Sequence, residues 1–347
     1  MKTSDFSFDL PEKLIAQTPI TPRDASRMLV CNRENSVRQH RIFRELPDFL
    51  RKGDVMVINH TKVISARLLG IKEDTGVPAE VLLLKRQSID MWETLVRPGR
   101  RLHTGAVVTF GDGRLMAVIG ETTEAGGRIV RFIYSGVFET LLDALGEMPL
   151  PPYIHEKLQD ANRYQTVYAK LDGSAAAPTA GLHFTQDVLT QIAQKGVDIV
   201  PVLLHVGLGT FRPVKAQAVE DHKMHSEYYK VTKDAADRIN AARQSGGRVL
   251  CVGTTSVRTL ETVAAPDGTI LPGGGMTSIF IKPGTPFKAT DMLLTNFHLP
   301  ESTLLMLVSA FMGKENALAA YDEAVRNEYR FFSFGDCMLI GNGLTQP

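Results

Sequence analysis

The sequence has few cysteines and no long apolar run, and these absences exclude several classes of protein. Its 347 residues contain three cysteines, Cys31, Cys251 and Cys337, which lie far apart and form no CxxC pair. A disulfide framework and a thiolate metal cluster are therefore not indicated, and we expect a reducing compartment. The first residues lack the apolar core of a signal peptide, and the run at 303–312 is too short to span a bilayer. We expect a cytoplasmic protein without a membrane segment.

An excess of charge of one sign is also lacking, because the formal net charge is +1. Total charge thus gives no argument for binding to nucleic acid or to a membrane, although a basic surface could exist locally. The P-loop, the GxGxxG fingerprint and the HExxH zinc motif are missing as well. The apolar fraction of 44% is sufficient for real cores, and the chain is longer than a usual single domain. Two domains are therefore expected.

Strand and helix patterns predict how these domains are arranged. Within 67–149, short apolar or alternating segments recur with Gly and Asp turns between them, which is typical of a small all-β barrel or sandwich. A short helix at 138–145 and a proline cluster end this region. Elsewhere, buried-type strands alternate with helical patterns, as in α/β layer structures. We predict a discontinuous α/β domain, 1–66 and 150–347, with an inserted β-barrel domain, 67–149.

The most distinct elements expected in the α/β domain are regular segments separated by turns. The strands are expected at 54–59, 197–204, 248–252, 277–281 and 337–340, and the helices at 187–195, 233–244, 257–263, 304–312 and 316–329.

The stretch 177–229 concentrates small, turn-forming and proton-transferring residues. It holds four of the nine histidines: His183, His205, His222 and His225. Histidine has a pKa near neutrality, and glycine is used where the backbone bends or approaches a ligand closely. His222 and His225 could bind a metal from one face of a helix, or form an acid–base set in which Asp221 orients a histidine. A structural histidine satisfied within the core is the third interpretation.

Two later segments carry groups that are typical of binding sites. At 248–261, a strand is followed by a turn and a helix start rich in hydroxyl groups, where free N–H groups favour an anion. Arg258 could hold a carboxylate there, although an ordinary helix cap explains the same residues. At 295–303, a loop before an apolar helix presents amide, imidazole and carboxylate groups. Its residues of interest are Asn296, Phe297, His298 and Glu301.

Assembled in order, these segments resemble the S-adenosylmethionine:tRNA ribosyltransferase-isomerase family of queuosine biosynthesis. The resemblance covers essentially the whole chain, with departures at His60, where the family usually has an acidic residue, and at Ser65, where it usually has proline. The matching motifs are Asp9-Leu-Pro, Pro22-Arg-Asp-Ala-Ser-Arg, and the stretches 177–185, 205–214, 221–229, 253–261, 296–311 and 329–336.

The resemblance implies an α/β domain with an inserted β-barrel and an unusual use of S-adenosylmethionine as a co-substrate. Its ribosyl unit would be transferred to 7-aminomethyl-7-deazaguanine at the tRNA wobble position and rearranged, giving epoxyqueuosine-tRNA, adenine and methionine. No cofactor and no metal are implied. The expected partners are S-adenosylmethionine and tRNA, and a monomer is expected. The alternatives are a metal-dependent hydrolase that uses His222 and His225, and a tRNA-binding protein without catalysis.

This chemistry assigns hypothetical roles to residues of the matched segments. Abstraction of a C5′ hydrogen next to the sulfonium needs a base, and departure of adenine needs an acid. The candidates for proton transfer are His183, His205, His222, His225 and Glu301, with no assignment between base and acid. S-adenosylmethionine would be bound by Gly253, Thr254, Thr255, Ser256 and Arg258. The deazaguanine base would be recognised by Phe184, Phe211, Asn296, Phe297 and His298. The tRNA phosphates would contact Arg23, Arg27, Arg97, Arg100 and Arg101.

Overall fold

The fold is that of a computed structural model of the chain, which describes residues 1–33, 37–123, 126–207, 214 and 216–344. The chain divides into two compact units. The larger unit comprises Met1–Lys62, Pro151–Leu171 and Ala177–Pro347, and the smaller comprises Val63–Leu150 and Asp172–Ala176.

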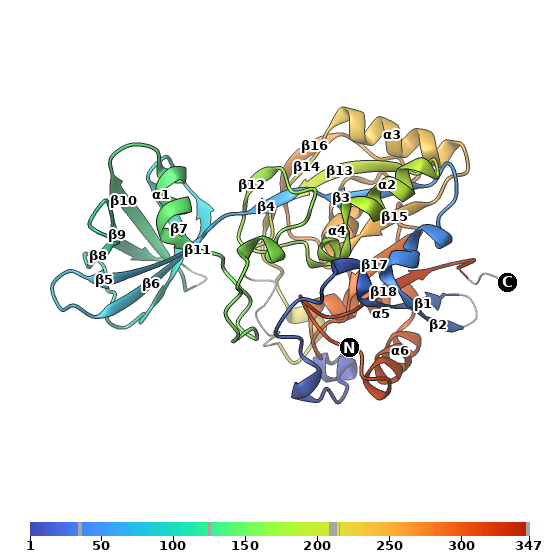
Figure 1. Cartoon of the computed structure of the whole chain (residues 1–347), viewed down its shortest axis with the longest axis horizontal. Coiled ribbons are helices and arrows are strands. Elements are labelled where there is room, and N and C mark those ends of the chain that lie inside the picture. Colours follow the sequence, from blue (N-terminus) through green and yellow to red (C-terminus); the bar gives the residue numbers. More distant parts are fainter. Residues whose placement is uncertain (34–36, 124–125, 208–213, 215, 345–347) are drawn as a thin grey trace. The chain divides into compact units, whose positions relative to one another are not determined.

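The larger unit is built on a nine-stranded mixed sheet with the order β16-β14-β13-β3-β15-β17-β18-β1-β2 (Figure 1). The strands β13, β3, β15 and β17 are mutually parallel. The strand β18 is antiparallel to β17 and parallel to β1, and the outer strands pair in antiparallel fashion. The bounds are β1 Arg27–Asn32, β2 Arg38–Ile42, β3 Val55–Asn59, β13 Asp198–Leu204, β14 Glu227–Val231, β15 Val249–Val252, β16 Gly273–Thr277, β17 Met292–Asn296 and β18 Cys337–Gly341.

Both faces of this sheet are covered, which explains why its central strands are apolar throughout. Along β3, Val55 and Val57 belong to one core, whereas Met56 and Ile58 belong to the other. Side chains alternate between the two faces of a strand, so a strand covered on both sides reads as a continuous apolar run. The first core contains residues of α3 Lys233–Gln244, α4 Gly253–Val263, α5 Thr303–Met312 and α6 Lys314–Arg326. The second contains residues of α2 Gln186–Gln194 and of the 3₁₀ helices η4 Phe43–Phe49 and η6 Thr179–His183.

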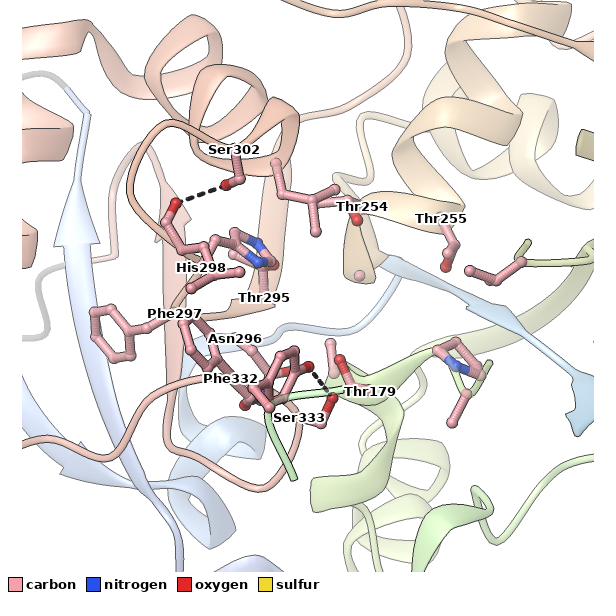
Figure 2. Close-up of a pocket in the computed structure, with 18 residues that line it drawn as sticks. Thr179, Thr254, Thr255, Thr295, Asn296, Phe297, His298, Ser302, Phe332 and Ser333 are labelled. Carbon is pink, nitrogen blue, oxygen red and sulfur yellow. Dashed lines mark hydrogen bonds between the residues drawn. The ribbon is translucent and has the colours of Figure 1, made fainter. Parts of the chain in front are cut away.

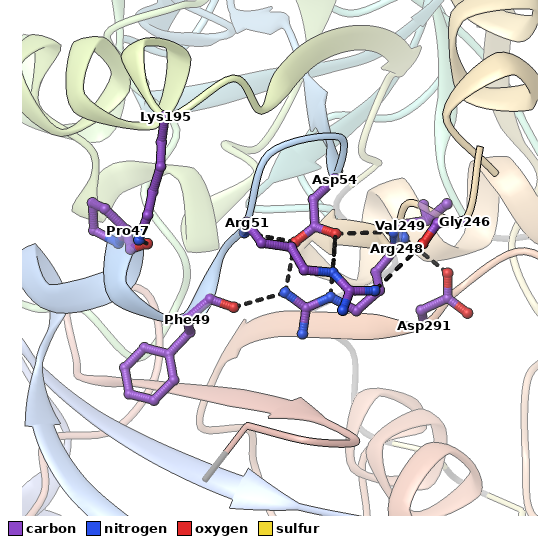
Figure 3. Close-up of polar contacts among 9 residues, drawn as sticks. All are labelled: Pro47, Phe49, Arg51, Asp54, Lys195, Gly246, Arg248, Val249 and Asp291. Atoms are coloured by element: carbon purple, nitrogen blue, oxygen red, sulfur yellow. Dashed lines mark hydrogen bonds and ion pairs between the residues drawn. The ribbon is translucent and has the colours of Figure 1, made fainter. Parts of the chain in front are cut away.

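At the amino ends of the central strands, charged side chains and backbone groups are joined by hydrogen bonds and ion pairs (Figure 3). The fully buried carboxylate of Asp54, just before β3, accepts from the Nη2 of Arg248 at 2.6 Å and from its backbone N–H at 3.0 Å. The backbone N–H of Arg51 also donates to this carboxylate, at 3.0 Å. Burial alone would raise the pKa of Asp54, but the bonds from Arg248 lower it overall. The charged groups at this end of the sheet therefore have a structural role, since they hold neighbouring strands together.

At the carboxyl ends, Asn59 joins the last residues of β3 and β13. Its Nδ2 donates to the carbonyl of Leu204 at 2.9 Å, and its Oδ1 accepts from the N–H of Leu204 at 3.1 Å and of Thr61 at 3.2 Å. The parallel strands β13, β3, β15 and β17 end along this same edge. In open α/β sheets, ligands bind in the crevice outside the carboxyl ends of the strands.

The smaller unit is a closed antiparallel barrel of six strands with the order β5-β6-β7-β10-β9-β8, closed by the pairing of β5 with β8. Every second side chain along its strands faces the core: in β9, for example, Leu115, Ala117 and Ile119 are buried. The helix α1 contributes Phe138 to this core. The bounds are β5 Arg67–Lys72, β6 Pro78–Arg86, β7 Met91–Arg97, β8 Val107–Phe110, β9 Leu115–Thr122, β10 Arg128–Tyr134, α1 Phe138–Leu145 and β11 Gly146–Glu147.

Short elements complete the described chain. A two-stranded ribbon pairs β4 Thr61–Val63 with β12 Leu171–Ser174. The remaining 3₁₀ helices are η1 Thr3–Phe6, η2 Glu12–Leu14, η3 Arg23–Ala25, η5 Ala161–Tyr164 and η8 Val219–Asp221. Within the described residues, none of the helices has both the length and the apolar character that a bilayer crossing requires.

The predicted fold class, a layered α/β domain with a small all-β barrel, is confirmed. Two local predictions are wrong. The strand expected at 277–281 is instead β16, Gly273–Thr277. Its three glycines pair with β14 through the backbone and have no side chains that could give a strand pattern in the sequence. The hypothetical helix bearing His222 and His225 is instead extended chain between η8 and β14, so the two histidines do not share a helix face.

Candidate functional site

A cavity opens at the carboxyl edge of the sheet in the larger unit (Figure 2). The space within it, counted together with the solvent at its open mouth, is about 680 Å³. Most of its lining comes from three segments, which are the segment before and within η6, the start of α4, and the segment from the end of β17 to α5. Four residues outside these segments complete the lining: Tyr153, Val206, Phe332 and Ser333. The lining residues are Tyr153, Ala177, Pro178, Thr179, Ala180, Val206, Gly253, Thr254, Thr255, Thr295, Asn296, Phe297, His298, Leu299, Ser302, Leu304, Phe332 and Ser333.

The start of α4 forms one wall and has the features of an anion site. The residue before the helix is Val252, whose side chain cannot cap it, and no side-chain cap is present. Gly253 has a φ of +81°, a conformation that favours glycine, and this turn brings the first helical residues to the cavity. The Oγ1 of Thr255 is buried and has no hydrogen-bond partner in the described part of the chain. Uncapped N–H groups and the helix dipole both stabilise a bound anion.

Asn296, the last residue of β17, forms the adjacent wall. Its Nδ2 donates to the carbonyl of Phe332 at 3.0 Å and to the Nε2 of His183 at 3.2 Å. The other ring nitrogen of His183, Nδ1, is 2.7 Å from the Oγ of Ser26. The Oδ1 of Asn296 is buried, and within the part of the chain that the structure describes it has no hydrogen-bond partner. The wall thus contains an amide whose nitrogen is fully engaged and whose oxygen is not.

The two buried histidines of this region are held neutral. His183 is stacked on Phe43 with ring centroids 5.2 Å apart, and His298 lies 2.9 Å from the Oγ1 of Thr295 through its Nε2. Burial lowers the pKa of each to about 3, and Arg23 and Arg330 contribute to the lowering for His183. At neutral pH both imidazoles therefore act as neutral hydrogen-bonding groups. His298 lines the cavity, whereas His183 contacts it through Asn296.

The other predicted proton-transfer residues do not line this cavity. His205 follows β13, with its Nδ1 2.8 Å from the Oγ1 of Thr61, and burial together with nearby His60 lowers its pKa. His222 is half-buried against Phe280, and its pKa is lowered by burial and by His225. His225 is exposed.

Glu301 stands between the cavity-lining residues Leu299 and Ser302, with a φ of 58°. Its backbone N–H donates to the carbonyl of Phe6 at 2.9 Å. Among the residues that the structure describes, no three His, Cys, Asp or Glu side chains form a group that could hold a metal ion.

Two members of the predicted S-adenosylmethionine set point elsewhere. Arg258 forms a buried ion pair with Glu227 of β14, and the side chains of these residues are 5% and 4% exposed. The Nε and Nη2 of Arg258 are buried and have no hydrogen-bond partners within the ranges that the structure describes. The Oγ of Ser256 donates to the carbonyl of Val252 at 2.8 Å within the helix. Gly253, Thr254 and Thr255 are the members that line the cavity.

The aromatic rings proposed as stacking platforms are in the core. Phe184 packs edge-on against Phe43, and Phe297 is surrounded by Tyr321, Tyr329 and Phe331, with no exposed surface on either phenylalanine. Phe211 lies outside the described residues. Asn296 and His298 are the members of the predicted base-binding set whose polar side chains line the cavity.

The predicted phosphate-binding arginines differ in how far their guanidinium groups are engaged. Arg23 donates to the carbonyls of Asn162 at 2.7 Å and Gln165 at 2.8 Å. Arg27 donates to the carbonyl of Asn327 at 2.9 Å and lies over the ring of Tyr329. By contrast, three arginines of the barrel, at the end of β7 and on the segment after it, are exposed and have no ion pair among the described residues: Arg97, Arg100 and Arg101.

Sequence reasoning missed part of the wall. Tyr153 and Ser333 line the cavity and are joined by a hydrogen bond of 2.7 Å between Tyr153 Oη and Ser333 Oγ. Tyr153 follows the proline cluster, which indicated only a boundary, and Ser333 lies in the aromatic stretch 329–336, which indicated core packing. A hydroxyl group within an aromatic stretch is a weak signal, since folding alone decides which way it faces.

Comparison with known proteins identifies the class to which this α/β protein with an inserted barrel belongs. The family model described as "Queuosine biosynthesis protein" matches residues 3–340. The chain is 60% identical to the S-adenosylmethionine:tRNA ribosyltransferase-isomerase of Caldanaerobacter subterraneus subsp. tengcongensis, over 98% of this chain and 100% of that protein. It is 56% identical to the protein of the same name from Clostridioides difficile, with the same coverage.

A crystal structure of S-adenosylmethionine tRNA ribosyltransferase from Thermotoga maritima is also similar. The sequence identity is 39% and the TM-score is 0.56, over 97% of this chain and 100% of that chain. The chain belongs to the queuosine biosynthesis protein family, as its sequence motifs predicted.

Proposed function

We propose that this chain is an enzyme that transfers and isomerises the ribosyl unit of S-adenosylmethionine onto tRNA. The observation that carries the proposal is similarity over essentially the whole chain to relatives named for this reaction, at 56% to 60% identity. The acceptor is 7-aminomethyl-7-deazaguanine at the wobble position, and the products are epoxyqueuosine-tRNA, adenine and methionine. Neither the hydrolase nor the binding-protein alternative is favoured by the relatives.

The cavity at the carboxyl edge is the proposed site of S-adenosylmethionine. Its methionine carboxylate would lie at the uncapped start of α4, where the N–H groups after Val252 and the unpartnered Oγ1 of Thr255 are available. The remaining wall combines apolar side chains with hydroxyl and amide groups, which suits an uncharged heterocycle. Thr254 and Thr255 are thus the proposed contacts of the ligand.

The reaction needs one group that accepts a proton and one that donates it. The sulfonium acidifies the C5′ hydrogens, and adenine leaves more readily when a ring nitrogen is protonated. His205, His222, His225 and Glu301 remain the candidates for these roles. His183 is a poor candidate for the base, because burial lowers its pKa to about 3 and both of its ring nitrogens are engaged. The residues so assigned act without a metal or a redox cofactor in this proposal.

The modified base would be recognised by hydrogen bonds on its pairing edge and by stacking. Asn296 and His298 supply polar groups in the cavity, and Phe332 and Tyr153 supply aromatic rings in its lining. The tRNA backbone would be bound by the exposed arginines of the barrel, Arg97, Arg100 and Arg101. Most other basic residues of the barrel are paired with acids, as Arg67 is with Glu80 and Arg86 with Glu139.

Mass spectrometry of the tRNA tests this function directly. Purified protein is incubated under chelator with S-adenosylmethionine and tRNA that carries the aminomethyl-deazaguanine base. An epoxycyclopentane adduct on the wobble nucleoside, together with free adenine, is expected. Unmodified tRNA from well-folded protein would overturn the proposal. An adduct that forms only when a divalent metal is restored would overturn the part of it that dispenses with a metal.

A further inference from the structure

The orientation of the Asn296 amide is determined by its surroundings. Its nitrogen lies within hydrogen-bond distance of two carbonyl oxygens, those of Phe332 at 3.0 Å and Asp336 at 3.5 Å. Rotating the amide by half a turn would bring its oxygen against these two oxygens, which is repulsive. The nitrogen must therefore face them, and the oxygen must face the other way.

This orientation in turn determines the tautomer of His183. Because the Asn296 nitrogen only donates, the Nε2 of His183 at 3.2 Å must accept and carry no proton. The single proton of the neutral ring is then on Nδ1, which donates to the Oγ of Ser26 at 2.7 Å. A second proton, on Nε2, would point at the amide hydrogens of Asn296. The same contact that orients the amide therefore opposes the charged form of His183.

The amide oxygen is the part of this chain of hydrogen bonds that remains unused. Asn296 lines the cavity at the end of β17 and is 2% exposed, and its Oδ1 has no hydrogen-bond partner among the described residues. A buried acceptor without a partner destabilises the folded protein, so its retention in a cavity wall indicates a group that forms its hydrogen bond when a ligand binds. Figure 2 shows Asn296 between His298 and Phe332 in this wall.

We propose that Asn296 accepts a hydrogen bond from an N–H group of the bound substrate, and that His183 is the positioning residue that holds the Asn296 amide for it. The inference rests on the proposed function, since it takes the substrates from there. Three N–H sources share this chemistry: the amino group of adenine, the ammonium group of the methionine part, and the pairing edge of the deazaguanine base. In each case the oxygen of Asn296 accepts, and His183 moves no proton.

Binding measurements on four variants test this inference. In the absence of tRNA, the affinities for S-adenosylhomocysteine and for 5′-methylthioadenosine are measured by calorimetry, and KM for tRNA is measured separately. We expect Asn296→Leu and His183→Leu each to weaken binding of the substrate that Asn296 contacts about tenfold, seen as a lower ligand affinity or a higher KM for tRNA. His183→Gln should recover most of this loss, because its side-chain carbonyl can accept from the Asn296 nitrogen. The double variant should be no weaker than Asn296→Leu alone, because the two residues act through one contact.

The pattern of losses identifies the N–H source. Weaker binding of both ligands indicates adenine, and weaker binding of S-adenosylhomocysteine alone indicates the ammonium group. A raised KM for tRNA with unchanged ligand affinities indicates the deazaguanine base. The matched control is His40→Gln on the outer strand β2, because this histidine also has both ring nitrogens engaged, by Tyr329 at 2.8 Å and Glu323 at 3.2 Å. It should leave all three quantities within twofold.

Two results would overturn the inference. The first is an Asn296→Leu protein that shows a cooperative thermal unfolding transition, and whose two ligand affinities and KM for tRNA stay within twofold of wild type. The second is a loss of kcat with an altered pH profile in both His183 variants while affinities and KM are unchanged, which would make His183 an acid or base. A wild-type protein that neither binds S-adenosylhomocysteine nor modifies tRNA would instead refute the proposed function.

Discussion

Asp54 and Asn296 lie at opposite ends of the same sheet, and they differ in how completely their polar atoms are satisfied. Both oxygens of Asp54 accept hydrogen bonds from Arg248 or Arg51. At the carboxyl end, neither the Oδ1 of Asn296 nor the Oγ1 of Thr255 has a partner among the residues covered by the structure. Buried polar groups of folded proteins are nearly always paired, so the unpaired atoms at one end distinguish a binding edge from a structural one.

The Arg258–Glu227 pair gives a prediction about stability. Replacing Arg258 by alanine removes the cation and leaves the Glu227 carboxylate buried, with the Gly207 N–H at 3.0 Å still donating to it. We expect the free energy of unfolding to fall by about 3–5 kcal/mol, as measured by denaturant titration. The double variant Arg258→Met with Glu227→Gln should lose much less, because both charges of the ion pair are removed together. Equal losses in the single and double variants would contradict this explanation.

The low pKa of His298, about 3 against an ordinary value of 6.5, gives a prediction about pH. Between these two values the unfolded chain binds a proton at this residue and the folded chain does not. The stability that His298 contributes is therefore complete above pH 6.5 and is lost as the pH falls towards 3. The expected slope is about 1.4 kcal/mol per pH unit.

Denaturant unfolding of wild type and of His298→Gln at pH 7 and pH 5 measures this slope. Carboxylates contribute equally to both proteins, so the difference between them isolates the histidine. The glutamine variant should lose less stability on acidification. Parallel pH dependence of the two proteins would show that His298 titrates normally.

At the level of the elements, the segment that follows β7 is the part of the barrel best suited to phosphate binding. The neighbouring hairpin between β8 and β9 carries Arg114, which is paired with Asp112 at 2.7 Å. Arg97, Arg100 and Arg101 have no such partner in the described part of the chain and are exposed. Unpaired arginines can neutralise phosphates without first losing an ion pair.

The salt dependence of tRNA binding tests this assignment. Each phosphate contact contributes about 0.7–0.9 to the slope of log affinity against log salt. Replacing the three arginines together by glutamine should weaken tRNA binding and reduce this slope by about 2–3, with the affinity for S-adenosylhomocysteine unchanged. Arg114→Gln is the matched control and should change the slope little. An unaltered slope in the triple variant would place the phosphates elsewhere.

At the level of the whole molecule, each unit has a hydrophobic core of its own. Phe132 of the barrel is 2% exposed and packs against Phe138, with ring centroids 5.1 Å apart. Replacing Phe132 by alanine should destabilise the barrel by about 3–5 kcal/mol. The single tryptophan, Trp92, lies in the barrel core and reports its unfolding by fluorescence.

The cavity lies within the larger unit, so the Phe132→Ala protein should still bind S-adenosylhomocysteine with an affinity within twofold of wild type. Ile133→Ala is the matched control, because this neighbouring side chain on β10 is 44% exposed and should cost little stability. A ligand affinity that falls in parallel with the stability of the barrel would show that the two units do not behave independently.

The sequence by itself determined the elements, because helix and strand patterns depend on local spacing. The helices at 138–145 and 233–244 have the predicted bounds, and Gly253, where a turn was expected, is the first residue of α4 directly after β15. The motifs also identified the family. The edge strand β16 was misplaced, because pairing through the backbone of glycines leaves no side-chain pattern.

Only the tertiary structure decided which polar groups face the cavity and which face the core. His183 and His298 belong to similar motifs, yet one contacts the cavity through Asn296 and the other lines it directly. The rings of Phe184 and Phe297 are fully buried, whereas Tyr153 and Ser333, to which the sequence assigned no role in binding, form part of the wall. Burial depends on contacts between residues far apart in the chain, such as that of Ser26 with His183, and local sequence carries no record of such contacts.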